Sequence, residues 1–325
     1  MKTIALIGCG GWGKNLARNL NALGVLKYIV DPSPAAAQLA ADLGVEHIEE
    51  PGAIWCDADI TAVVIATPAE THCPLGLAAL AAGKHVYVEK PIALSTEDAR
   101  KLSAAADKAQ LQLMVGHLLQ YHPVYRALAA LTADGQLGAL RHIISNRLNL
   151  GMVRSEENVM WSFSPHDVSM ILGLANGRPT RVRAIGSQFL QSGIHDVVTM
   201  HIDFDDGMTA EVRSSWCHPE KEQKLIVVGD TAMAVFDDTA AWEDKLTLTS
   251  YTIDRQLPRP KAIRGNVQAI NVEKGEPLLL EMQHFIDCVD ANERPLTDAD
   301  EAIAVLAVLQ AGQRSLDSEG GWVNV

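Results

Sequence analysis

The stretch Thr3-Ile-Ala-Leu-Ile-Gly8-Cys9-Gly10-Gly11-Trp12-Gly13 sets the architecture of the first part of this chain. It is a short apolar run, typical of a buried strand, followed by G-x-G-x-x-G spacing and then by a helical pattern of leucines. Gly8 would allow a tight turn, Gly10 would let the backbone approach a pyrophosphate, and Gly13 would let the helix pack closely on the strand. The spacing predicts a dinucleotide cradle, with the candidate residues Gly8, Gly10, Gly11, Trp12 and Gly13.

A second apolar run, Tyr28-Ile-Val-Asp31, ends in an acid roughly twenty residues after the glycines. A carboxylate at this point can accept a hydrogen bond from the 2′-hydroxyl of a ribose and repels a 2′-phosphate, which favours NAD over NADP. The alternative is a plain strand-to-helix turn with a turn acid. We favour the cofactor site, because strand, glycines, helix, strand and acid follow one another in the expected order.

Apolar strands and helical segments alternate up to residue 120, as in a doubly wound parallel sheet. The further strands are expected at 60–67, 85–90 and 112–116, and helices at 74–82 and 96–110. Thr67-Pro68 and Glu89-Lys90-Pro91 fall at carboxyl ends of strands, where such sheets bind ligands. Proline restricts the residue before it to extended backbone, so Thr67 and Lys90 are expected at the ligand crevice.

Beyond residue 120 the pattern becomes rich in strands. Strands are expected at 140–150, 181–189, 197–204, 208–216, 224–229 and 232–236, helices at 123–131, 164–174, 277–290 and 298–315, and a mobile loop at 256–265. We predict an NAD-binding Rossmann domain at 1–120. We predict an α+β domain for substrate binding and oligomerisation at 121–325, with a large open, mostly antiparallel sheet and its C-terminal helices packed back on the Rossmann domain.

Composition and charge exclude several classes of function. The chain has 325 residues and a net charge of −13, which opposes non-specific binding of nucleic acid. No apolar run reaches membrane-spanning length, and the N-terminus enters a strand without the features of a signal peptide. The 5 scattered cysteines suit reduced thiols better than a disulfide framework. A cytoplasmic protein without a metal site is expected.

Several of these features together resemble the glucose-fructose oxidoreductase / inositol dehydrogenase (Gfo/Idh/MocA) family. They are the glycine motif, Thr67-Pro68 with His72, Glu89-Lys90-Pro91, the antiparallel second domain, and His166-Asp167 at the start of a helix. The resemblance extends over essentially the whole chain. It implies an NAD-dependent dehydrogenase, with Thr67, Pro68, His72, Glu89 and Lys90 at the cofactor.

Within this family, the blocks 116–123, 145–151, 157–161 and 164–167 are similar to bacterial nucleotide-sugar 3-dehydrogenases. This similarity implies oxidation of the 3-hydroxyl of a UDP-sugar, with the keto product passed to a PLP aminotransferase in the synthesis of lipid A or another cell-surface diamino sugar. UDP-N-acetylglucosamine is the leading substrate, and its uronate is an alternative. An NAD-binding regulatory protein without catalysis is the alternative from another class.

Oxidation of a secondary alcohol needs a group that takes or stabilises the hydroxyl proton, and Lys90 and His166 are the candidates. Histidine ionises near neutral pH without help, so His166 is predicted to be the general base and Lys90 the partner that orients the hydroxyl, although these roles can be exchanged. The alternatives are a solvated lysine at a strand end and a histidine bonded to backbone. Many family members have an aspartate four residues before the histidine, where this chain has Ser162. A proton relay would therefore use Asp167, water or the substrate.

A UDP-sugar also carries a diphosphate, which guanidinium groups bind well. The basic candidates are Arg147, Arg154, Lys221 and Arg264. Asn149, Asn158 and Tyr121 are candidates for contacts with sugar hydroxyls or the acetamido group, although a basic residue on a sheet can be simply solvated and Tyr121 can simply pack. The open face of the second domain is expected to pair with another copy, as a homodimer or homotetramer.

Overall fold

The computed structural model describes residues 3–254 and 259–325, and the chain divides into two compact units. Unit 1 comprises Met1–Tyr121 and Glu276–Leu306, and unit 2 comprises His122–Gly275 and Ala307–Val325. The sequence boundary predicted at 120 thus lies one residue before the end of the first segment, and the chain returns to unit 1 after residue 275. Among the described residues, no helix has both the length and the apolar character needed to cross a membrane.

Unit 1 contains a six-stranded sheet in the order β3-β2-β1-β4-β5-β6, and all its neighbouring strands pair in parallel. The strands are β1 (Thr3–Ile7), β2 (Leu26–Val30), β3 (Glu46–Ile48), β4 (Ile60–Ile65), β5 (His85–Val88) and β6 (Leu113–Val115). The order reverses between β1 and β4, which is the switch point where such sheets bind ligands. The doubly wound fold expected from the alternating pattern is confirmed.

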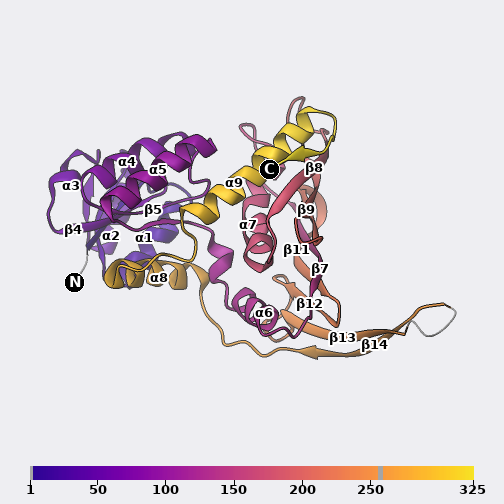
Figure 1. Cartoon of the computed structure of the whole chain (residues 1–325). Helices are drawn as coiled ribbons and strands as arrows, with labels where there is room; N and C mark the ends of the chain where they lie inside the picture. Colours follow the sequence, from indigo (N-terminus) through magenta and orange to yellow (C-terminus); the bar gives the residue numbers. More distant parts are fainter. Residues whose placement is uncertain (1–2, 255–258) are drawn as a thin grey trace. The chain divides into compact units, whose positions relative to one another are not determined.

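Helices cover both faces of this sheet. They are α1 (Gly13–Ala22), α2 (Pro34–Leu43), α3 (Gly52–Cys56), η1 (Ala69–Thr71), α4 (His72–Ala81), α5 (Thr96–Ala109), η2 (Leu118–Tyr121), α8 (Pro277–Ala291) and the first part of α9 (Ala299–Asp317). Figure 1 shows α4 and α5 on one side of the sheet and α8 on the other. Helix α8 packs against α1 and η2, and its Phe285 meets the ring of Tyr87 edge-on at 5.8 Å in the core.

Unit 2 contains a nine-stranded sheet in the order β14-β13-β12-β11-β7-β10-β9-β8-β15. The strands are β7 (Leu140–Leu150), β8 (Pro179–Ser187), β9 (Val197–Phe204), β10 (Thr209–Ser215), β11 (Cys217–Gly229), β12 (Ala232–Asp237), β13 (Leu246–Asp254), β14 (Lys261–Ala269) and β15 (Val323–Asn324). Strands β7 and β10 pair in parallel, and the other neighbours pair antiparallel. The mostly antiparallel sheet expected from the sequence is confirmed.

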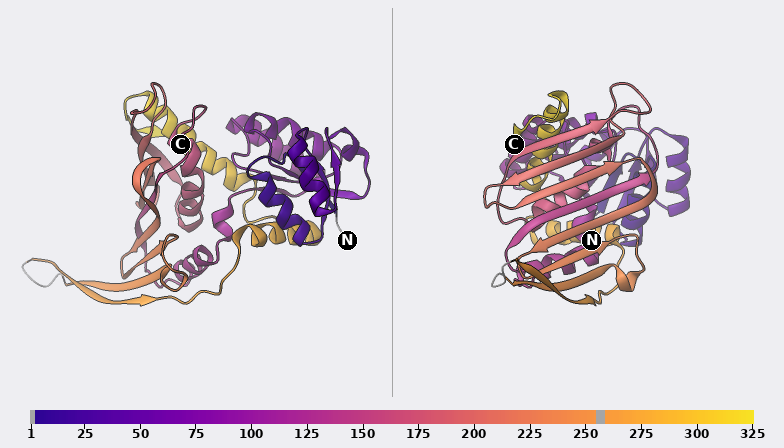
Figure 2. Two further views of the ribbon diagram at one scale, coloured as in Figure 1. Left: turned by 180° about the vertical axis from the view of Figure 1, so that it is seen from behind. Right: turned by 90° about the vertical axis from the view of Figure 1, so that its right-hand side faces the viewer.

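The helices of unit 2 lie on one face of its sheet. They are α6 (Pro123–Ala133), α7 (Val159–Leu174), η3 (Trp242–Asp244) and the second part of α9. In the right-hand view of Figure 2 the sheet is seen face-on with its helices behind it. Along β9 every second side chain is buried, which is the pattern of a sheet with one covered face.

Three expectations about unit 2 were wrong. The strand expected at 224–229 begins at Cys217, as β11. Helix α7 begins at Val159 instead of 164, because the Asn158 side chain caps it by accepting from the backbone of Met160 and Trp161. His166 therefore lies within the helix and does not open it. Of the loop expected at 256–265, residues 256–258 lie outside the described residues and 261–265 belong to β14.

Candidate cofactor and active site

The glycine loop leaves no room for side chains at its first and last glycines. Gly8 has a φ of +90°, and a Cβ added to it would lie 2.6 Å from the carbonyl oxygen of Ala66. A Cβ on Gly13 would overlap the carbonyl oxygen of Gly8. Around Gly10 and Gly11 a Cβ would meet open space, so the backbone there is free to face a ligand. This geometry fits a pyrophosphate placed at the start of α1.

Asp31 follows β2 and is fixed by backbone donors from both sides. Its Oδ2 accepts from the backbone N–H of Cys9 at 2.7 Å, and its Oδ1 accepts from that of Ser33 at 2.8 Å. Burial acts to raise the pKa of Asp31, but the hydrogen bonds from Ser33 and Cys9 outweigh it and lower the pKa below its usual range. Asp31 is therefore a carboxylate at neutral pH and is attached to the glycine loop.

A cavity of about 580 Å³ opens beside these residues, which is a typical size for a cofactor pocket. Its lining includes Gly8, Gly10, Asp31, Thr67 and Pro68. The carboxylate of Asp31 thus stands at the wall of a cavity that also touches the glycine loop and the end of β4. These residues fit the dinucleotide expected from the sequence.

His72 is buried between the segments that follow β4 and β5. Its side chain is buried, with Nδ1 at 2.7 Å from the carbonyl oxygen of Pro91 and Nε2 at 2.8 Å from that of Thr67. Burial lowers the pKa of His72. The ring thus joins the segments that follow β4 and β5, and its predicted contact with the cofactor stays a prediction.

Glu89 connects the glycine loop to the segment that carries Lys90. Its Oε1 accepts from Trp12 Nε1 at 2.6 Å and from the Tyr87 hydroxyl at 3.1 Å. Its Oε2 accepts from the backbone N–H of Lys90 at 3.3 Å. Burial raises the pKa of Glu89, although all three of these donors favour its charged form. The Lys90–Pro91 peptide bond that follows is cis.

In unit 2, His166 stands on α7 beside an acid that is tied to the sheet. Asp167 is fully buried, and its carboxylate accepts from Ser145 Oγ at 2.6 Å, Arg147 Nε at 2.7 Å and Arg147 Nη2 at 3.2 Å. Both oxygens of Asp167 are therefore engaged with β7, which fixes the helix turn that carries His166. The structure supports a positioning role for Asp167 in place of a proton relay.

The predicted substrate residues fall into different environments. Arg147 is paired with Asp167 and its side chain is 14% exposed. Tyr121 is buried in unit 1 with its hydroxyl 2.9 Å from Thr297 Oγ1, so the structure gives it a packing role in the core instead of the suggested substrate contact. Asn149 is half-buried and Arg154 is exposed, and both remain predictions.

The side chain of Asn158 is largely occupied within unit 2. Besides capping α7, it donates from Nδ2 to Gln313 Oε1 at 2.9 Å, and the same oxygen accepts from Trp161 Nε1 at 3.0 Å. These bonds hold the start of α7 to α9. The predicted contact between Asn158 and a sugar is a proposal that the geometry does not strengthen.

Sequence reasoning missed two residues, Ser145 beside Asp167 in unit 2 and Glu281 beside Glu89 in unit 1. Ser145 shares the buried face of β7 with Arg147, and the two-residue spacing on a strand is the signal that could have identified it. Glu281 is an acid on the apolar face of α8 with Leu278 and Phe285, and its helical spacing from them was a similar signal. Among the described residues, no group of three or more His, Cys, Asp or Glu side chains could hold a metal ion.

Comparison with known proteins gives matches along most of the chain. Residues 2–117 match the oxidoreductase family with an NAD-binding Rossmann fold, and residues 125–235 match the Gfo/Idh/MocA C-terminal domain. The first of these matches confirms NAD as the expected cofactor.

Relatives with known activities agree with these domain matches. The chain is 27% identical over 305 residues to the UDP-N-acetylglucosamine 3-dehydrogenase of Acidithiobacillus ferrooxidans, with 93% of each protein covered. It is 26% identical over 315 residues to scyllo-inositol 2-dehydrogenase (NAD⁺) of Bacillus subtilis, covering 92% of this chain and 90% of that protein. A crystal structure of the Acidithiobacillus enzyme, GnnA, superposes with a TM-score of 0.85 at 25% identity, with 98% of each chain covered.

Proposed function

Because the chain belongs to the Gfo/Idh/MocA oxidoreductase family, we propose that it oxidises the 3-hydroxyl of UDP-N-acetylglucosamine with NAD⁺. The likeness to the Acidithiobacillus enzyme over 93% of the chain supports this substrate. The similarity to an inositol dehydrogenase supports the broader reaction, the oxidation of a secondary alcohol on a polyhydroxylated ring.

One observation carries the proposal, the attachment of the Lys90 segment to the glycine loop. The Glu89 carboxylate accepts hydrogen bonds from both the indole N–H of Trp12 and the backbone N–H of Lys90. The lysine backbone is therefore fixed to the loop that fits the pyrophosphate. This attachment supports a role for the Lys90 segment beside the bound dinucleotide.

The chemistry follows from the residue types. Bound NAD⁺ supplies the acceptor for the hydride that leaves C3 of the sugar. His166 takes the proton of the 3-hydroxyl as general base, and Lys90 as an ammonium orients the hydroxyl and stabilises its oxygen as the carbonyl forms. Asp167, held by Ser145 and Arg147, keeps the helix turn of His166 in place.

The remaining parts of the proposal concern the substrate and partners. Arg147, Arg154 and Asn149 bind the diphosphate and the sugar, and a PLP aminotransferase consumes the keto product in the synthesis of a cell-surface diamino sugar such as that of lipid A. The helix-free face of the sheet in unit 2 pairs with a second copy, as a homodimer or homotetramer. The free thiols of all 5 cysteines favour a reducing compartment, and we place the enzyme in the cytoplasm.

The deciding assay supplies NAD⁺, a UDP-sugar, glutamate and a PLP aminotransferase that removes the ketone, and follows the absorbance of NADH. Formation of NADH with UDP-N-acetylglucosamine but not with its uronate supports the proposal. Formation of NADH with the uronate but not with UDP-N-acetylglucosamine supports the acidic substrate instead. If neither sugar is oxidised although NAD binds tightly, the result supports a regulatory protein.

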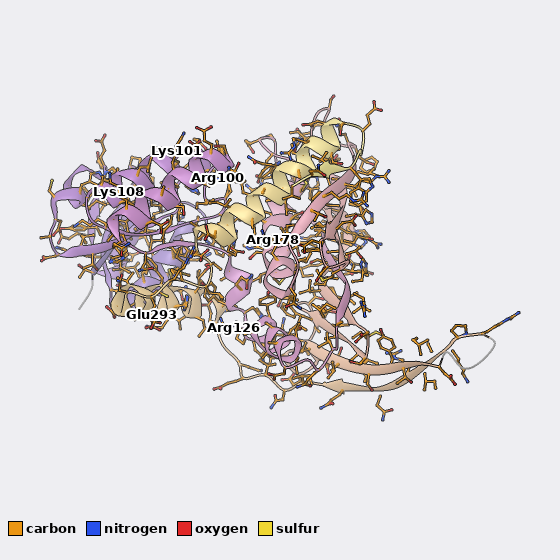
Figure 3. All side chains as sticks on the ribbon, in the orientation of Figure 1. Arg100, Lys101, Lys108, Arg126, Arg178 and Glu293 are labelled. Atoms are coloured by element: carbon orange, nitrogen blue, oxygen red, sulfur yellow. The ribbon has the colours of Figure 1, made fainter. Side chains whose placement is uncertain are left out.

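Variants test the assigned residues. Lys90→Ala and His166→Ala should each lower kcat by about a hundredfold to ten-thousandfold, while the Kd for NAD stays within a few-fold of the original. Lys108→Ala is the control, because Lys108 is an exposed lysine on α5 (Figure 3) and should leave kcat unchanged. Near-normal turnover in both active-site variants would contradict the assignment.

A further inference from the structure

A buried acid lies next to the Glu89 network and has no part in the chemistry described above. Glu281 projects from α8 into the core of unit 1 and is 0% exposed. Neither of its carboxyl oxygens has a hydrogen-bond partner among the described residues. Burying an ionised carboxylate without hydrogen bonds would cost a large amount of folding free energy.

Ionisable groups face Glu281 from several elements. Tyr87 on β5 and Glu89 after it interact electrostatically with the Glu281 carboxyl group, and so does Glu276 at the start of α8. Tyr121 of η2 also lies within electrostatic range of Glu281. Burial, followed by repulsion from Glu89, holds the pKa of Glu281 well above its usual range, although the nearby Tyr87 hydroxyl acts to lower it. Burial and the neighbouring Glu89 thus both disfavour the charged form of Glu281.

The protons in this network can be counted. The Tyr87 hydroxyl donates its one hydrogen to Glu89 Oε1 at 3.1 Å, which leaves the hydroxyl oxygen as an acceptor. A neutral carboxyl group has one O–H to donate, whereas a carboxylate has none. Only the neutral form of Glu281 could therefore donate a hydrogen bond to the oxygen of its neighbour Tyr87.

The space around Tyr87 and Glu89 is closed on another side. A Cβ added to Gly116, which follows β6, would lie 2.5 Å from the Tyr87 hydroxyl and 2.9 Å from Glu89 Oε2. Tyr87 itself is fully buried. The two side chains thus have little room to adopt another arrangement, and the direction of each donated hydrogen is determined by its neighbours.

We infer that Glu281 is a positioning residue: as a neutral acid it donates toward Tyr87, Tyr87 donates to Glu89, and Glu89 remains the single carboxylate that holds Trp12 and the Lys90 backbone. This inference rests on the proposed function for its effect on turnover, because it acts through the segment that carries Lys90. The donated hydrogens all run toward one carboxylate, and such chains strengthen one another.

The first experiment asks whether Glu281 carries a proton. Infrared difference spectra between the original protein and Glu281→Gln at neutral pH should contain the carbonyl band of a protonated carboxyl group, shifted in heavy water. Glu293→Gln makes the same chemical change at an exposed acid just after α8 (Figure 3) and should lack that band. If the Glu281→Gln difference spectrum also lacks it, Glu281 is ionised and the inference is wrong.

The second experiment measures the Kd for NAD and needs no sugar. Glu281→Gln keeps a donor and should bind NAD within about twofold of the original, whereas Glu281→Met has none and should bind about two- to tenfold more weakly. At alkaline pH the original should lose affinity as Glu281 ionises beside Glu89, and Glu281→Gln should keep it. Equal affinities of the Met variant and the original, or the same alkaline loss in the Gln variant, would overturn the inference.

The two proposals can fail separately. If Glu281→Met does not fold, the infrared spectrum and the alkaline profile of Glu281→Gln still decide the matter. A protein that oxidises no UDP-sugar leaves the NAD and infrared results interpretable. Conversely, a failed inference about Glu281 does not change the outcome of the assay with UDP-sugars.

Discussion

Replacing Asp167 by alanine is expected to destabilise unit 2 by about 3–5 kcal/mol, the usual cost of removing one partner of a buried ion pair. Asp167 is fully buried and accepts from Ser145 Oγ and twice from the Arg147 guanidinium. Without it, a guanidinium that is 14% exposed loses its counter-ion and a buried hydroxyl loses its acceptor. Because the arginine retains some contact with water, the lower end of this range is expected.

Urea unfolding followed by tryptophan fluorescence provides the measurement. The chain has 6 tryptophans, of which Trp12 and Trp55 lie in unit 1 and the others, including the fully buried Trp216, lie in unit 2. In a background with Trp12→Phe and Trp55→Phe, the emission therefore reports the transition of unit 2 even if the two units unfold separately. Arg147→Met combined with Asp167→Ala should be more stable than Asp167→Ala alone, because the double variant leaves no unpaired charge. A loss below about 1 kcal/mol in Asp167→Ala, or a less stable double variant, would refute this account of the pair.

Three further outcomes are expected. Asp31→Ala should weaken NAD binding about tenfold to a hundredfold in a fluorescence titration, because a charged acceptor of hydrogen bonds is lost. Gly13→Ala should abolish NAD binding and lower the melting temperature, since its Cβ would overlap a backbone carbonyl oxygen. Burial acts to raise the pKa of Asp238, but His122 and Lys245 outweigh it and hold the pKa at about 2. Because this pKa is depressed on folding, stability should fall from about pH 4 towards pH 2 in urea titrations, and Asp238→Asn should reduce that dependence.

Much of unit 1 could be predicted, because its signals are local. A buried parallel strand is a short apolar run, and the glycines and Asp31 follow their strands directly, so the order of the motifs already places them at one edge of the sheet. The strand Leu140–Leu150 was predicted with the observed bounds, since its pattern also lies in adjacent residues.

The parts that could not be predicted depend on distant contacts. Asp167 and Arg147 are 20 positions apart, and only the packing of α7 on the sheet brings them together. Strand β14 is exposed at every position, so no alternation of apolar residues marked it. The start of α7 was missed for a different reason: the prediction began the helix at Ser164, whereas the actual cap, Asn158, lies further upstream.

His72 couples two loops that a protein engineer would otherwise randomise one at a time. Its ring spans the carbonyl groups of Thr67 and Pro91, which come from loops more than 20 residues apart in the chain. Libraries that vary both loops around this histidine should therefore display epistasis, with substitutions tolerated in one loop only alongside particular partners in the other. Directed evolution towards other sugars should therefore vary the two loops together in the same library.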